Sequence, residues 1–139
     1  MSATLTLAED AQRTAGILLL ALVAVEWGGT FMLRVVAGGV PATTFQSSFY
    51  RAGHAHAGVL VVLALLSQIL VSATDVDGLW RLTASTGVAF AAILMPLGFF
   101  VSAAGRGLER PNRFVALIWL GALSLAAGVV ALGLALLVG

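Results

Sequence analysis

Four apolar segments, each long enough to cross a bilayer, dominate this sequence. A helix needs about 20 mainly apolar residues to span a hydrocarbon core of roughly 30 Å. The 139-residue chain is 60% hydrophobic and only 9% charged, whereas soluble domains carry about a quarter charged residues. We therefore predict an all-α, polytopic membrane protein, a single domain over residues 1–139 that folds as a four-transmembrane-helix bundle. The spans cover about residues 14–36, 48–73, 79–104 and 114–138.

The composition also limits the classes of partner. The chain has no Cys and no Lys, and its net charge is +1. A disulfide scaffold is thereby excluded, and we expect no nucleic-acid partner because no basic field is available to neutralise phosphates. The first apolar segment follows acidic residues and is too long for a signal sequence, so we expect no cleaved signal peptide.

Two residues indicate how the inner helices begin and bend. We expect Ser47 or Ser48 to cap the second helix, and Pro96 interrupts the third segment.

The arginines are divided unevenly between the two sides of the membrane. The first and third loops with their flanks carry one acid, Glu109, and five arginines: Arg34, Arg51, Arg106, Arg110 and Arg113. The other side carries two arginines and four acids: Arg13, Arg81, Glu9, Asp10, Asp75 and Asp77. We expect an integral protein of a bacterial inner or cell membrane, and basic residues concentrate in its cytoplasmic loops. Loops one and three would be cytoplasmic and both termini outside.

Small residues form a stripe on the fourth segment at three- and four-residue spacing: Gly121, Ser124, Gly128, Ala131 and Ala135. Such a stripe lets another helix approach closely. The neighbour is either a helix of the same subunit or one of another subunit.

Both histidines lie near the start of the second segment, in a run of small residues. His54 and His56 are about 200° apart around a regular helix, so they cannot chelate one metal ion together. A single histidine is enough to hold a haem iron. We expect His56 about two turns into the helix, with small neighbours that leave room for a flat macrocycle: Gly53, Ala55, Ala57 and Gly58. The alternative is a hydrogen-bonded packing residue.

The five arginines on the same side would pair with the acidic edge of a haem, because guanidinium binds carboxylate through two hydrogen bonds. The third segment returns to this side, and its end is expected near the depth of His56: Met95, Gly98, Phe99 and Phe100.

Glu26 is the one acid well inside a span, where an unpaired charge costs several kcal/mol. Thr30 and Arg34 follow it on the same helix face. It is a candidate proton-relay group, a substrate anchor, or a partner of Arg34 through water. The alternative is a protonated carboxyl that is hydrogen-bonded inside the bundle.

Two short motifs carry a resemblance to a known family. The stretch Ala55-His56-Ala57-Gly58 resembles the Ala-His-Ser-Gly stretch at the second span of styrene oxide isomerases. Pro111-Asn112-Arg113-Phe114 is similar to a Pro-Asn-Arg-Phe stretch before their fourth span. The same sequence neighbourhood of His56 is also similar to that of hydroxylaminobenzene mutases, which are small four-span membrane isomerases too.

The resemblance implies a homotrimer with haem b at subunit interfaces and His56 as the axial iron ligand. Ferric iron would act as a Lewis acid, opening the epoxide of a small hydrophobic substrate to a cation that becomes a carbonyl compound. Other haem-site residues would be His54, Arg51, Arg113, Asn112, Arg34 and Phe100. Phe99, Phe100 and Trp27 would offer aromatic faces to the cation.

The chain departs from that family where the isomerases carry Asn, Asp and Tyr near the haem. The aligned positions are Val62, Ala92 and Phe100, which have no hydrogen-bonding group. Glu26 is a candidate catalytic residue in their place. Two other functions therefore stay open. One is a non-catalytic haem protein for electron transfer, sensing or haem handling. The other is a small transporter or accessory subunit in which Glu26 carries protons.

Overall fold

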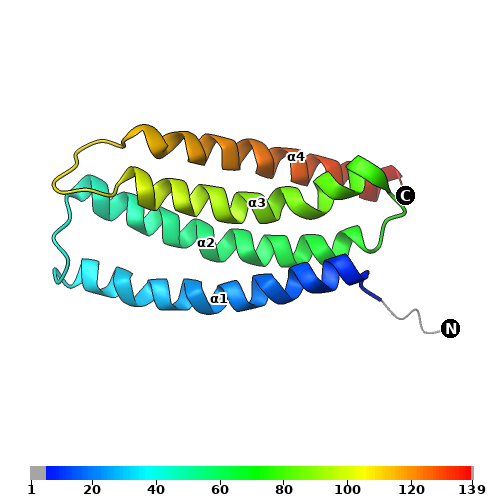
Figure 1. The fold of residues 1–139 in the computed structure, drawn as a ribbon, viewed down its shortest axis with the longest axis horizontal. Coiled ribbons are helices and arrows are strands. Elements are labelled where there is room, and N and C mark those ends of the chain that lie inside the picture. The colour runs from blue at the N-terminus through cyan, green and yellow to red at the C-terminus, as the bar shows by residue number, and fades with distance from the viewer. Residues whose placement is uncertain (1–5, 139) are drawn as a thin grey trace.

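The computed structural model describes residues 6–138, and it confirms the four-helix fold (Figure 1). Helix α1 spans Glu9–Val36, α2 spans Thr44–Val71, and α3 spans Gly78–Ser102. A short 3₁₀ helix, η1 (Arg113–Val115), leads directly into α4 (Ala116–Val138). All four long helices are apolar and long enough to cross a bilayer. Pro96 lies inside α3, which stays helical through it.

The helices pack in chain order, α1 on α2, α2 on α3, and α3 most extensively on α4 (Figure 1). Helix α4 also borders α2, whereas α1 packs chiefly on α2 and forms one edge of the bundle. The second helix is therefore central, with α1 against one of its sides and α3 against another.

The start of α2 differs from our expectation. Thr43, not Ser47 or Ser48, is the N-cap, and Thr43 and Gln46 form a capping box in which each side chain bonds the other's backbone N–H. The Thr-x-x-Gln pattern is the sequence signature of this motif. His56 consequently lies twelve residues beyond Thr44, which is about 18 Å and more than three turns into the helix rather than two.

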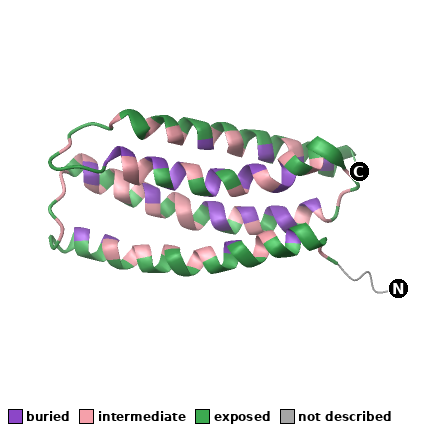
Figure 2. Ribbon diagram, viewed as in Figure 1, coloured by how far each residue is buried: buried purple, intermediate pink, exposed green. Residues whose placement is uncertain are grey.

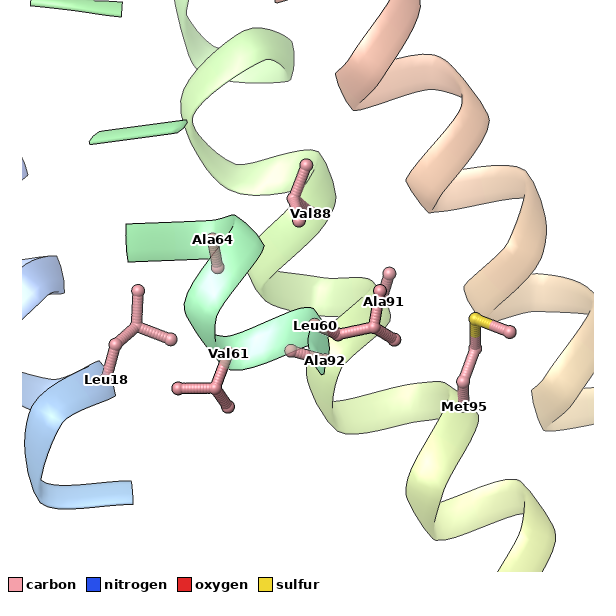
Figure 3. Close-up of a cluster of buried hydrophobic side chains, with 8 residues drawn as sticks. All are labelled: Leu18, Leu60, Val61, Ala64, Val88, Ala91, Ala92 and Met95. Atoms are coloured by element: carbon pink, nitrogen blue, oxygen red, sulfur yellow. The ribbon is translucent and has the colours of Figure 1, made fainter. Parts of the chain in front are cut away.

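The core lies between the central parts of α2 and α3, with Leu18 added from α1 (Figure 3). Its buried members are Leu18, Leu60, Val61, Ala64, Val88, Ala91, Ala92 and Met95. Figure 2 shows that the outward faces of the helices are largely exposed, and large apolar side chains such as Leu20 and Trp119 lie on them. In a bilayer these faces meet lipid tails, so their exposure carries no hydrophobic cost.

Helix α4 packs against α3 of the same chain through the stripe of small residues, so the structure decides between the two possible neighbours. A Cβ atom on Gly87 would lie 2.6 Å from Gly128 Cα, so the two backbones touch. Ser124 Oγ donates a hydrogen bond of 2.8 Å to the Gly87 carbonyl. Trp80 Nε1 donates to the Ala131 carbonyl at 2.8 Å. Close backbone contact of this kind is how membrane helices associate without a hydrophobic driving force.

We predict that Gly128→Leu lowers the free energy of unfolding by about 1–3 kcal/mol, because rigid backbone atoms of α3 occupy the space that the side chain needs. Gly133→Leu is the matched control, since a Cβ on Gly133 meets nothing within 4 Å. Circular-dichroism melting in detergent measures both changes. Equal melting temperatures for the two variants would contradict this account of the α3–α4 contact.

Candidate functional site

Charged residues gather at the two ends of the bundle, as the sequence predicts. The end of α1, the start of α2 and the loop between α3 and η1 lie together (Figure 1), and they bring the five arginines to one end. We call this the basic end: Arg34, Arg51, Arg106, Arg110 and Arg113. At the other end Arg81 Nη2 lies 3.6 Å from Asp10 Oδ1. That is the one ion pair within residues 6–138.

A buried glutamine that our sequence analysis missed ties the two loops of the basic end together. Gln46 is 2% exposed. Its Nε2 donates to the carbonyls of Ala103 at 2.9 Å and Gly105 at 2.7 Å, and its Oε1 accepts from Thr43 N–H at 3.1 Å. Tyr50 donates to the same Ala103 carbonyl at 3.2 Å. The Thr-x-x-Gln spacing indicates the cap. The carbonyls that Gln46 binds belong to residues 57 and 59 positions further along the chain, and no local sequence pattern indicates those contacts.

Asn112 has a structural task that accounts for its place in the Pro-Asn-Arg-Phe motif. Its Oδ1 accepts a hydrogen bond of 2.9 Å from Phe114 N–H, which caps η1. Its Nδ2 donates to the Val101 carbonyl at 3.0 Å, and its backbone N–H donates to the Ser102 carbonyl at 2.9 Å. Asn112 thus joins the end of α3 to the start of η1. These hydrogen bonds explain the residue without a ligand.

We predict that Gln46→Leu destabilises the protein by about 2 kcal/mol, because it leaves buried backbone groups without hydrogen bonds. It should also speed tryptic cleavage after Arg106, since the loop loses its anchor. Ser48→Ala is the control, because exposed Ser48 bonds only the Thr44 carbonyl in its own helix. Melting curves and the time course of proteolysis measure the two effects. Unchanged proteolysis in Gln46→Leu would refute the anchoring role.

The imidazole of His56 is held in one orientation by its own helix. Its Nδ1 lies 2.7 Å from the Ala52 carbonyl oxygen. A carbonyl can only accept, so Nδ1 carries a proton, and in the neutral imidazole Nε2 then keeps a free lone pair. A hydrogen bond from the second ring nitrogen is the usual support of a histidine that binds a metal. The ring is half-buried, and its centroid lies 4.9 Å from that of Phe99.

The glycines and alanines around the histidines are divided between two sides of α2. Gly53 is buried, and a Cβ there would lie 3.0 Å from side-chain atoms of both Phe99 and Phe100, so aromatic rings fill the space that we expected for a macrocycle. Gly58 has nothing within 4 Å of an added Cβ. Together with Ala55 it lines an open hollow beside His54 rather than His56.

Phe99, not Phe100, is the aromatic residue beside His56. Phe99 also meets Phe49 edge to face, with centroids 5.4 Å apart. Phe100 instead stacks on Tyr50 at 5.8 Å and meets Phe31 at 6.4 Å. The three positions that depart from the isomerase pattern are dispersed, since Ala92 is in the core and Val62 lines the hollow beside His54. Trp27 is 75% exposed on α1.

His54 lies on the side of α2 that packs against α1, away from His56, and the 200° separation predicts that the two histidines lie on different faces. A Cβ on Gly28 would be 3.6 Å from its Nδ1, and one on Gly29 would be 3.7 Å from its Nε2. Three adjoining hollows along the α1–α2 seam share this histidine. Glu26 lines one of them and Arg51 another. The structure therefore groups Glu26 with His54, whereas His56 lies beside α3.

The remaining arginines of the expected haem site are exposed at the basic end. Arg34 lies in the last turn of α1. The guanidinium of Arg113 lies 5.3 Å from the centroid of the Phe114 ring. Neither side chain is paired with a carboxylate within the described part of the chain.

Comparisons with known proteins found no family model, no curated protein and no solved structure that matches this chain.

Proposed function

We propose that this protein is an integral-membrane isomerase that binds haem b through His56 and converts an epoxide into a carbonyl compound. The observation that carries the proposal is the hydrogen bond from His56 Nδ1 to the Ala52 carbonyl. In the neutral imidazole this bond directs the proton to Nδ1, so Nε2 would be available as an axial ligand, deep in a membrane helix. The resemblance of the Ala-His-x-Gly stretch to the styrene oxide isomerases supplies the reaction.

Because Phe99 and Phe100 fill the space beside Gly53, a macrocycle bound to His56 would lie against the outside of the subunit, where aromatic side chains would meet its apolar face. The Phe99 ring packs on the imidazole and restricts its rotation. The half-buried position leaves the imidazole reachable from outside the subunit, which suits a haem held between subunits of a homotrimer. Arg51 precedes His56 by five residues, about 7.5 Å nearer the basic end of the helix, and it lies on the His54 side of α2. The arginines of that end would pair with the haem propionates.

A ferric haem would supply a Lewis acid that polarises the epoxide oxygen. The chain's own contributions are orientation and exclusion of water. Phe99 presents a ring face to positive charge that develops in the substrate. The surrounding apolar side chains keep water from adding to the opened ring. We place the basic end in the cytoplasm, because positively charged loops stay on that side.

Haem binding is tested by the absorption spectrum of the protein purified in detergent. We expect a Soret band in the wild-type protein, its loss in His56→Ala, and its partial return when imidazole is added to that variant. His54→Ala is the matched control and should keep the band. A wild-type protein without the band after expression with added haem precursor would refute the proposal, as would a band that depends on His54 alone.

The isomerase reaction is tested with styrene oxide, followed by chromatographic detection of phenylacetaldehyde. We expect conversion by the haem-loaded wild-type protein and a fall of at least about 100-fold in His56→Ala, since loss of one strong electrostatic stabiliser costs roughly 10²–10³ in rate. A haem-loaded protein that leaves this and other aryl epoxides unchanged would instead be a non-catalytic haem protein.

A further inference from the structure

The seam between α1 and α2 contains a groove that the proposed haem site does not use. Its three hollows, of about 300, 450 and 430 Å³, meet at His54. We call it the His54 groove. Apart from His54, Glu26 and Arg51 its walls are apolar or small: Leu22, Val23, Val25, Met32, Leu33, Val36, Ala55, Gly58, Val59 and Val62.

Two polar side chains of this groove lack a partner at the depth of the hydrocarbon. Glu26 lies ten residues before the end of α1, and His54 lies ten residues after the start of α2. Both are therefore about 15 Å from the basic ends of their helices. Within residues 6–138 neither side chain makes a hydrogen bond or an ion pair. Unpaired polar groups at this depth cost several kcal/mol, and such residues usually mark functional sites.

The separation between the side chains of Glu26 and His54 leaves room for a ligand between them. They line one hollow of about 430 Å³, yet no carboxylate oxygen of Glu26 lies within 4.0 Å of a His54 nitrogen. Gly28 and Gly29 place no side chain over the imidazole. The two side chains thus border the same hollow, and their polar atoms do not satisfy each other.

We propose that the His54 groove binds a small apolar molecule that carries one hydroxyl head, taken up from the bilayer. A hydroxyl offers one donor and two acceptor lone pairs, so it can bond a carboxyl and an imidazole together. Arg51 lines the adjoining hollow and would repel a cationic head. A neutral head also avoids the cost of burying a new charge. The apolar body would lie along the walls of the groove.

This inference does not depend on haem, because His54 and His56 lie against different helices. The test uses the full-length protein in detergent, labelled with ¹⁵N-histidine and titrated with 4-phenylbutan-1-ol. Its two imidazoles are assigned with His54→Ala and His56→Ala. We expect a saturable shift of the His54 resonance that leaves His56 in place. Butylbenzene, which has the same body without the hydroxyl, should bind at least about tenfold more weakly, the equivalent of one hydrogen bond.

Glu26→Leu should weaken binding of the alcohol by a similar factor and leave butylbenzene unaffected. Glu9→Leu is its matched control, because it removes an acid from the same helix outside the groove. Equal binding of alcohol and hydrocarbon by the wild-type protein would overturn the proposal, as would no binding of either. This comparison needs no variant, so it stands even where Glu26→Leu fails to fold.

Discussion

In the hydrocarbon of a bilayer no water is available, so each polar group needs a partner within the protein. The described helices obey this constraint almost throughout. Ser67, Thr83 and Thr86 donate to carbonyls of their own helices at 2.7–2.9 Å. Gln68, which is 1% exposed, donates to the Ser85 carbonyl on the next helix at 2.7 Å. The groups left over are therefore informative, and within the described spans they include Nε2 of His56, the polar side chains of the His54 groove and the indole N–H of Trp27.

The central position of α2 decides how those groups are distributed. Because α1 and α3 pack on different sides of this helix, two histidines separated by one residue enter different environments. His56 meets an aromatic ring of α3 and bonds its own helix. His54 meets the glycines of α1 and shares a groove with Glu26. One short sequence run thus places its two histidines in distinct surroundings, which is why each proposed site can be tested with the other histidine as its control.

Several features followed from local sequence patterns. Length and apolarity predicted the four helices, and the arginine distribution predicted the basic end, since both depend on composition along the chain. The separation of the two histidines followed from helical geometry alone. The predicted depth of His56 in the helix was wrong, because it assumed that Ser47 or Ser48 caps α2. The capping-box pattern of Thr43 and Gln46 indicates the correct start.

Local sequence patterns did not predict which side chains of neighbouring helices contact each other. Phe99 and Phe100 are adjacent in sequence, yet only the packing of α3 on α2 decides which of them lies beside His56. From sequence alone, the small-residue stripe of α4 could pack against a helix of a neighbouring subunit or of the same chain. The structure shows that it contacts Gly87 of α3 in the same chain.

The sequence by itself determined that the chain spans a membrane and where its rare polar residues lie along each helix, because hydropathy and helical period act locally. Only the tertiary structure decided that Glu26 faces His54 rather than His56. Which faces of two helices meet depends on how backbones separated by many residues pack together.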